Sequence, residues 1–123
     1  MSNQKSGKEN ELGLPSLQER GTRGEAMQQY VIIAQDGTDS EALDRRMSVR
    51  SMHHLTGARE LKEQNNFVFG GAMLNDEGKM CGSIMIVQFE TKEEFDHWYA
   101  NEPYILGGVW KAIEVKPFKV ADV

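Results

Sequence analysis

The sequence predicts one α+β domain, with helices packed on one face of an antiparallel sheet. Short apolar runs rich in β-branched residues, which are typical of strands, alternate with two longer segments of helical composition. The chain has 123 residues, of which 39% are hydrophobic and 27% charged, as in an ordinary globular protein. This length suffices for one domain with one hydrophobic core, so a single folded unit is expected.

Residues 1–26 differ in composition from the rest of the chain. They contain no aromatic residue, and after Met1 only Leu12, Leu14 and Leu17 offer apolar bulk. Such a segment buries too little surface to offset the entropy lost on ordering it. We therefore expect residues 1–26 to form a flexible extension and residues 27–123 to form the folded domain. A short helix or partner contact around Leu12–Leu17 is the alternative.

The first half of the domain predicts a strand followed by a long helical segment. The apolar run Tyr30–Ala34 indicates a largely buried strand. Thr38 and Glu41 form a capping-box pattern, which places a helix start near residue 39. Helical composition then continues to residues 65–66, with a break expected near residues 49–51, where β-branched and small side chains gather.

The next segment predicts a β-hairpin. A strand is expected over Phe67–Met73, and its glycines allow close approach of a neighbour or a ligand. Residues 75–78 read Asn-Asp-Glu-Gly, a turn-forming sequence. A third strand is expected over Ser83–Phe89.

The last third of the chain predicts one helix and one strand. Thr91 and Glu94 form a second capping box, and the helix that follows ends before Pro103, because proline disfavours helical geometry in the residue that precedes it. The final strand is expected over Trp110–Val120, and Pro117 within it predicts an edge or bulge position.

The resulting order β-α-β-β-α-β is that of the ferredoxin-like split βαβ arrangement. Both helices would cover the same face of the sheet and leave the other face bare. Because exposed apolar sheet is unfavourable, back-to-back dimerisation is expected.

Composition excludes several classes of function. A net charge of −5 without a basic cluster argues against binding to nucleic acid or to an anionic membrane surface. No apolar run approaches the roughly 20 residues of a transmembrane helix, and no signal sequence is evident. Cys81 is the single cysteine, which fits a reducing, cytoplasmic setting. Small molecules or proteins remain as partners, and no residue pattern indicates a tightly held cofactor.

His53 and His54 are adjacent, so on a helix their side chains diverge by about 100° and do not share one metal ion. The helical wheel places His54 on the apolar face and His53 on the solvent side. Two interpretations of His54 remain open on these grounds: a buried, hydrogen-bonded core residue, or a functional group. The residues that define the apolar face are Leu55, Ala58 and Leu61.

The other reactive side chains are weaker candidates on local grounds. His97 falls on the outer face of its helix, so a zinc site formed by His54, His97 and an acid is not expected. Cys81 has no neighbouring base and fits a small buried side chain. Glu102 precedes Pro103 and is held in extended geometry, from which its carboxylate can turn inward.

Several short segments carry a resemblance to a known family: residues 30–36 (YVIIAQD), 45–50 (RRMSVR) with His53-His54-Leu55, 71–73 (GAM), 82–83 (GS), 102–104 (EPY), 108–109 (GV) and 115–119 (VKPFK). Together they resemble the YciI-like (YCII-related) family over roughly Tyr30 to Lys119. The resemblance implies a ferredoxin-like fold that forms a dimeric α+β barrel, with a pocket in which a histidine and an aspartate do acid–base chemistry on a small molecule.

Carried over residue by residue, the resemblance implies that Glu102 takes the place of the family aspartate. Counting back from residues 71–73 selects His54 as the family histidine, counting forward from Arg50 selects His53, and the helical wheel favours His54. Ser83 and Tyr104 are the implied substrate-binding residues.

The implied function is a lyase- or isomerase-like acid–base enzyme, with dehydrohalogenation or elimination on a ring compound as one version. Glu102 would orient the ring of His54, and the other ring nitrogen would move a proton on the substrate. The alternatives are a non-catalytic dimeric module that binds a small molecule or a partner, and a dimer in which His54 and Glu102 form a structural pair.

Overall fold

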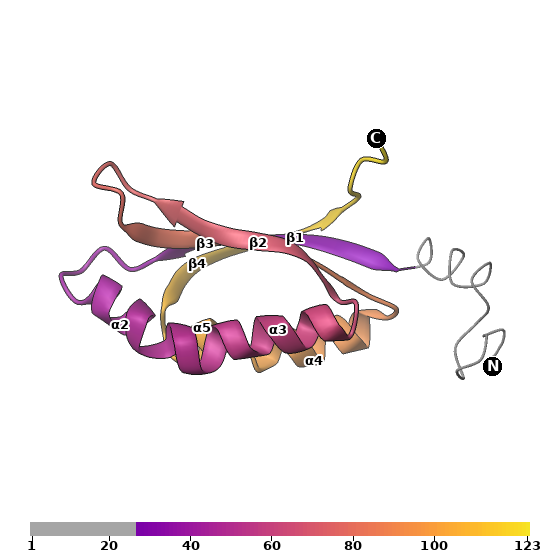
Figure 1. The fold of residues 1–123 in the computed structure, drawn as a ribbon, viewed down its shortest axis with the longest axis horizontal. Helices are drawn as coiled ribbons and strands as arrows, with labels where there is room; N and C mark the ends of the chain where they lie inside the picture. Colours follow the sequence, from indigo (N-terminus) through magenta and orange to yellow (C-terminus); the bar gives the residue numbers. More distant parts are fainter. Residues whose placement is uncertain (1–26) are drawn as a thin grey trace, which may run out of the picture.

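The computed structural model describes residues 27–123, and the prediction of a flexible extension over residues 1–26 lies outside this part of the chain. All helices lie on one face of a four-stranded antiparallel sheet with the strand order β2-β3-β1-β4 (Figure 1). This arrangement confirms the predicted ferredoxin-like α+β class. The elements are β1 (Gln28–Asp36), α2 (Ala42–Val49), η1 (Arg50–His54), α3 (Leu55–Glu63), β2 (Phe67–Leu74), β3 (Met80–Phe89), α4 (Lys92–Ala100), α5 (Pro103–Leu106) and β4 (Trp110–Phe118).

The core lies between the sheet and the helices. Tyr30, Ile32 and Ala34 alternate along β1 and are buried on the helix-covered face. Ile32 pairs with Met85 on β3, which is also buried. Full burial of one such aliphatic side chain stabilises a fold by about 1.5–3 kcal/mol, so this alternating row fixes which face of β1 turns inward.

The long helical segment differs from its prediction at its start and in its middle. The helix α2 begins at Ala42, and Thr38 does not cap it. Instead, Asp39 accepts a hydrogen bond from the backbone of Glu41 at 3.3 Å and forms an ion pair with Arg45 at 2.7 Å. The charged Asp39 carboxylate thus takes the place that the pattern assigned to the Thr38 hydroxyl.

The predicted break in this segment is a π-helical turn, η1, which runs directly from α2 into α3. A π-turn inserts one extra residue into the helical repeat, so it rotates the side chains that follow relative to those before it. His53 and His54 close this turn, and His54 is buried while His53 is exposed. The inward orientation predicted for His54 is confirmed.

The predicted hairpin is also present. Asn75 accepts hydrogen bonds from the backbone of Glu77 and Lys79 at 2.9 and 3.0 Å, and Gly78 adopts a φ of 80°. The strand β3 begins at Met80, three residues before the prediction. Within it the chain passes close to β1 at Gly82. A Cβ atom there would lie 2.6 Å from the carbonyl oxygen of Ala34, so only glycine fits.

The prediction for the last third missed one element. Thr91 caps α4 as expected, with its hydroxyl accepting from the backbone of Glu94 at 3.1 Å. After α4 ends, Pro103 opens the short helix α5 instead of merely stopping a helix, since proline is well suited to the first helical position. Strand β4 lies at the edge of the sheet, as Pro117 predicted.

Among residues 27–123, no helix covers the second face of the sheet (Figure 1). Phe69 and Phe118 lie on it and are 53% and 42% exposed. The back-to-back dimer expected from the sequence stays a prediction. Within residues 27–123, no helix is both long enough and apolar enough to cross a membrane.

Candidate active site

The two residues proposed as an acid–base pair from the resemblance are in direct contact. The Nδ1 atom of His54, at the end of η1, lies 2.7 Å from Oε1 of Glu102, at the start of α5. Their side chains are 11% and 3% exposed. The two residues are 48 positions apart in the sequence, and the fold brings them together by packing the π-turn η1 against α5.

The chemistry of this contact fixes the proton on the histidine ring. An ionised carboxylate only accepts hydrogen bonds, so Nδ1 of His54 carries the hydrogen and donates it to Glu102. The lone pair of the neutral ring is therefore on Nε2. The same Oε1 atom of Glu102 accepts a hydrogen bond from the backbone N–H of Tyr104 at 2.9 Å. The first turn of α5 thus holds the carboxylate in place.

Tyr104 forms a wall beside the histidine. Its ring stacks on that of His54 with a centroid distance of 3.9 Å and an interplanar angle of 11°. Burial raises the pKa of Tyr104 above its ordinary value of 10, and the positive charges of Arg46 and Arg50 act in the opposite direction. The phenol stays neutral at physiological pH, so Tyr104 offers a hydroxyl group and not a base. That hydroxyl oxygen is buried and has no hydrogen-bond partner within residues 27–123.

A second buried polar cluster lies against the first. The Nη1 atom of Arg46 donates to both carboxylate oxygens of Asp36 at 3.0 Å, and Nη2 donates to Oγ of Ser83 at 2.8 Å. Trp110 Nε1 donates to the same Oγ at 3.2 Å. Because Ser83 Oγ accepts both bonds, its own hydroxyl proton remains available to a ligand.

Sequence reasoning missed the roles of Asp36 and Arg46. The strand predicted over Tyr30–Ala34 stops short of Asp36, which continues the buried alternation of Ile32 and Ala34. This alternation was the available signal, since a carboxylate on the inner face of a strand needs a buried partner. No comparable signal distinguishes Arg46 from the neighbouring Arg45, because the helix start was predicted three residues too early.

His54, Ser83 and Tyr104 line one small cavity between the sheet and the helices, with a volume of about 130 Å³. Glu102 does not line this cavity; it contacts His54 and lines the larger groove described below. Arg46 and Arg50 bring positive charge to the cavity wall, while Asp36 is engaged by Arg46. The remaining lining residues are Leu55, Ala58, Phe67, Gly70, Gly71, Ala72 and Met85.

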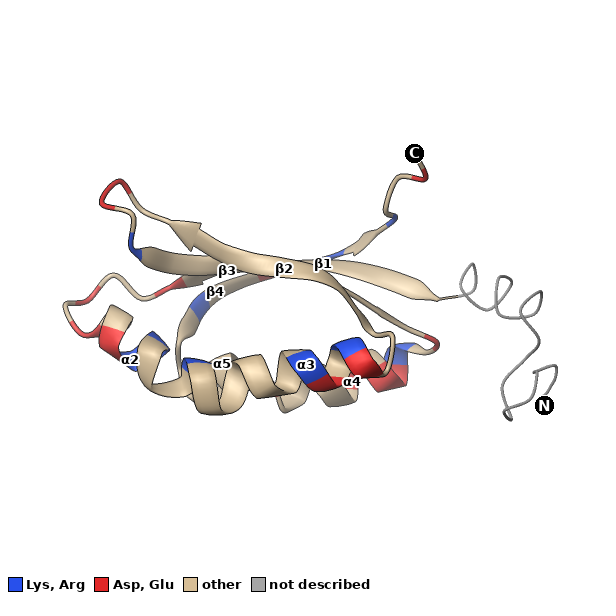
Figure 2. Ribbon diagram, in the orientation of Figure 1, with Lys and Arg blue, Asp and Glu red and all other residues tan. Residues whose placement is uncertain are grey.

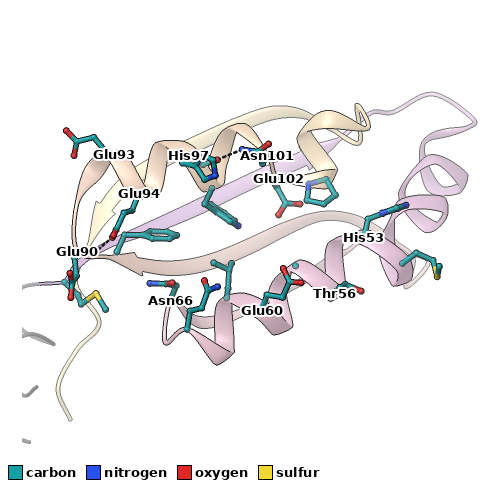
Figure 3. A pocket seen from close by; sticks show the side chains of 18 residues that line it. His53, Thr56, Glu60, Asn66, Glu90, Glu93, Glu94, His97, Asn101 and Glu102 are labelled. Carbon is teal, nitrogen blue, oxygen red and sulfur yellow. Dashed lines mark hydrogen bonds between the residues drawn. The ribbon is translucent and has the colours of Figure 1, made fainter. Parts of the chain in front are cut away.

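A larger groove of about 920 Å³ lies between α3 and α4, and His53 lines it (Figure 3). Acidic residues lie on both helices (Figure 2), among them Glu60 and Glu94, and none of the described residues that line the groove is a lysine or an arginine. His97 also lines it and is exposed, as predicted. Within residues 27–123, no cluster of three or more histidine, cysteine or acidic side chains has the spacing of a metal site.

Comparisons with known proteins agree on one family. The YCII-related domain matches residues 28–119. The protein YciI of Escherichia coli O6:H1 is 38% identical over 96 residues, which cover 73% of this chain and 95% of that protein. An uncharacterized protein of Haemophilus influenzae is 35% identical over the same shares.

One solved structure is similar in fold and in sequence. It is the 5-chloro-2-hydroxyhydroquinone dehydrochlorinase of Burkholderia phenoliruptrix AC1100, in complex with 2,5-dihydroxybenzoquinone. Its TM-score is 0.64 at 26% identity, and the match covers 76% of this chain and 95% of that one. The extent of the domain match and the identity to YciI establish that the chain belongs to the YCII-related domain family.

Proposed function

We propose that the protein is a lyase that removes a proton and a leaving group from a hydroxylated ring compound. The observation that carries the proposal is the buried contact between His54 and Glu102, which leaves Nε2 of the ring as a base at a small cavity. A buried, oriented histidine of this kind suits general acid–base catalysis.

The dimensions and walls of the cavity support a single ring as the substrate. Its volume of about 130 Å³ is close to the ~150 Å³ of an apolar cavity that admits benzene. Tyr104 provides an aromatic wall and Met85 and Phe67 provide apolar ones. Arg46, Ser83 and Tyr104 add polar groups that can bind ring substituents.

The likeness to the dehydrochlorinase supports the type of reaction. That enzyme's name denotes loss of hydrogen chloride, and its bound ligand is a dihydroxylated quinone. By analogy, the reaction proposed here takes a proton from a ring hydroxyl or from the adjacent carbon and expels a halide. One proton and one halide leave together, so the step needs no external oxidant or reductant.

In this mechanism Nε2 of His54 accepts the substrate proton. The imidazolium that forms keeps its hydrogen bond to Glu102, whose negative charge stabilises it. Ser83 and Tyr104 bind the oxygen substituents of the ring and hold it against His54. The halide leaves as the free anion and the proton passes from His54 to solvent, which restores the neutral histidine.

The direct test is to supply the purified protein with 5-chloro-2-hydroxyhydroquinone and to follow chloride release and quinone absorbance together. We expect the two signals to rise in equal amounts, above the rate without protein. Quinone formation without chloride release would indicate plain oxidation by air, and no acceleration of either signal would contradict the proposed reaction.

A second candidate is a non-catalytic binding module with a structural His54–Glu102 pair. It is favoured by the second hydrogen bond of Glu102, which caps α5 and so has a use in folding alone. Substituting His54→Ala separates the two. A loss of thermal stability with no ligand response in either protein supports the structural pair, whereas retained stability with a lost ligand response supports a site.

We further propose that two copies associate through the uncovered sheet face. The exposed Phe69 and Phe118 on this face support it, since exposed apolar sheet favours association. Sedimentation velocity at micromolar concentration should show a dimer, and Phe69→Lys should shift it towards the monomer. A clean monomer of the unmodified protein would contradict the dimeric barrel.

A further inference from the structure

The two buried carboxylates near the cavity already accept hydrogen bonds, and Nε2 of His54 is the acceptor that the proposed reaction uses. Both carboxylate oxygens of Asp36 accept from Arg46, and Oε1 of Glu102 accepts from His54 and from the backbone of Tyr104. Each of these carboxylates is at least nine-tenths buried. A ligand that enters the cavity therefore meets few acceptors for its own hydrogen-bond donors.

The unused groups are donors. Nε of Arg46 and the hydroxyl of Tyr104 are buried and have no hydrogen-bond partner within residues 27–123. Arg46 is 2% exposed and Tyr104 is fully buried. Arg50 lines the same cavity and is half-buried, and its side chain makes no hydrogen bond or ion pair in the described part of the chain. A buried donor without a partner is unfavourable, so a ligand that supplies an acceptor regains this free energy.

The charges at the cavity wall favour an anionic acceptor on the ligand over a neutral one. Arg46 is neutralised by Asp36 at 3.0 Å, and Glu102 faces His54. Arg50 is the remaining full positive charge at the cavity wall. Proton transfer to His54 creates an imidazolium beside Glu102 and a negative oxygen on the ring. The first charge has a partner in Glu102, and Arg50 is the cation available to the second.

We propose that Arg50, with the Tyr104 hydroxyl and Nε of Arg46, forms a subsite for an ionised oxygen on the substrate ring. The substrate class is then a ring compound with an acidic enol or phenol, such as a hydroxyquinone or a polyhydroxylated phenol. This inference rests on the proposed function for the ring and for the role of His54. It adds the charge state of the ligand and a binding residue, Arg50.

The test compares two quinones by calorimetric titration of the full chain. 2,5-Dihydroxy-1,4-benzoquinone is a vinylogous acid that is ionised at neutral pH, and its dimethoxy analogue has the same ring without acidic protons. We expect the unmodified protein to bind the acidic quinone at least about tenfold more tightly than its ether. Arg50→Gln should abolish most of this preference, and Arg50→Lys should restore part of it.

A matched control is Arg59→Gln, which removes one arginine from an exposed position on α3 that does not line the cavity. It should leave both affinities unchanged. Equal binding of the two quinones by the unmodified protein, no binding of the acidic quinone, or equal losses in the Arg50→Gln and Arg59→Gln variants would each overturn the subsite.

The outcome is separable from that of the proposed function. If the acidic quinone binds through Arg50 but no halide is ever released, the subsite stands and the lyase proposal fails. If halide is released at the same rate by the Arg50→Gln variant under subsaturating substrate, the lyase proposal stands and the subsite fails.

Discussion

The neighbouring residues His53 and His54 line two different pockets. His54 faces a cavity of about 130 Å³ under the sheet, where charged and polar side chains are buried and mostly paired. His53 faces a groove of about 920 Å³ between α3 and α4, where the acidic side chains Glu60, Glu93 and Glu94 are exposed to solvent. The groove is about seven times larger than the cavity, and these three acidic side chains are more exposed than Asp36 and Glu102.

The cavity at His54 is the better candidate site because its polar side chains are buried, although the groove at His53 has the larger volume. Water screens the exposed carboxylates of the groove, so their mutual interactions are weak and their geometry is loose. Beside the cavity, the Glu102 carboxylate accepts hydrogen bonds from two donors, and the ring of His54 is held by stacking on Tyr104. Such restraint preorganises a base, which is what proton transfer requires.

The largest expected effect comes from exchanging the two histidines separately. His54→Gln should lower the rate of halide release by about 10²–10⁴, because the general base is lost. His53→Gln should change the rate less than about twofold, since that ring is exposed and has no buried partner. Steady-state rates of both variants measure this. Comparable losses of rate in the two variants would contradict the assignment of His54 as the general base.

The next effect concerns the stability that Glu102 gives to the cavity wall. Glu102→Ala should lower the free energy of unfolding by about 1–3 kcal/mol, because the donors on His54 and on the backbone of Tyr104 lose their acceptor. Urea denaturation monitored by tryptophan fluorescence measures it. Glu60→Gln, on an exposed wall of the groove, is the control and should stay within about 0.5 kcal/mol.

Filling the cavity should act on binding more than on folding. Gly70 pairs with Met85 on the inner face, and a Cβ atom there would lie 3.2 Å from Cγ of Met85 and from the ring of Phe67. Gly70→Val should therefore reduce quinone affinity at least about tenfold while costing about 1–3 kcal/mol of stability. Unchanged affinity in a folded variant would show that ligands do not enter this cavity. Gly57→Ala is the control, because Gly57 lies on α3, does not line the cavity, and its Cβ would meet no atom within 4 Å.

The smallest effect is a dependence of stability on alkaline pH through Tyr104. Burial holds its pKa in the folded protein above 10, while the unfolded chain ionises near 10. The unfolded state therefore loses a proton first, and stability falls as pH rises from about 10 through the folded pKa. Tyr104→Phe should remove this part of the decline. Urea denaturation of both proteins at about pH 8 and about pH 11 checks it, and parallel declines would contradict a buried Tyr104.

The fold was largely predictable because local signals agreed with one another. Alternation in β1, the Thr91 cap of α4 and the turn at residues 75–78 each point to the observed element. The helix α5 was not predictable in this way, since four residues after a proline carry no periodic pattern. The predicted start of α2 was wrong because Thr38 makes no capping hydrogen bond there and Asp39 pairs with Arg45 instead. Such a pair depends on the position of both side chains.

The candidate site was predictable only in part, for a related reason. The helical wheel selected the inward ring of His54, and the contact with Glu102 followed the family resemblance. The cluster of Asp36, Arg46 and Ser83 depends on three elements that meet across the core. No local pattern encodes that meeting, so it became visible only in the folded structure.

The most direct test of the central claim is a histidine-selective NMR titration. The chain has three histidines, and side-chain ¹⁵N spectra resolve the tautomer and the ligand response of each ring. We predict that His54 shows a hydrogen on Nδ1 and that its Nε2 signal moves when 2,5-dihydroxy-1,4-benzoquinone is added, while the rings of His53 and His97 do not respond. A response at His53 or His97 with an unchanged His54 would contradict the assignment of His54 as the base at the ligand-binding cavity.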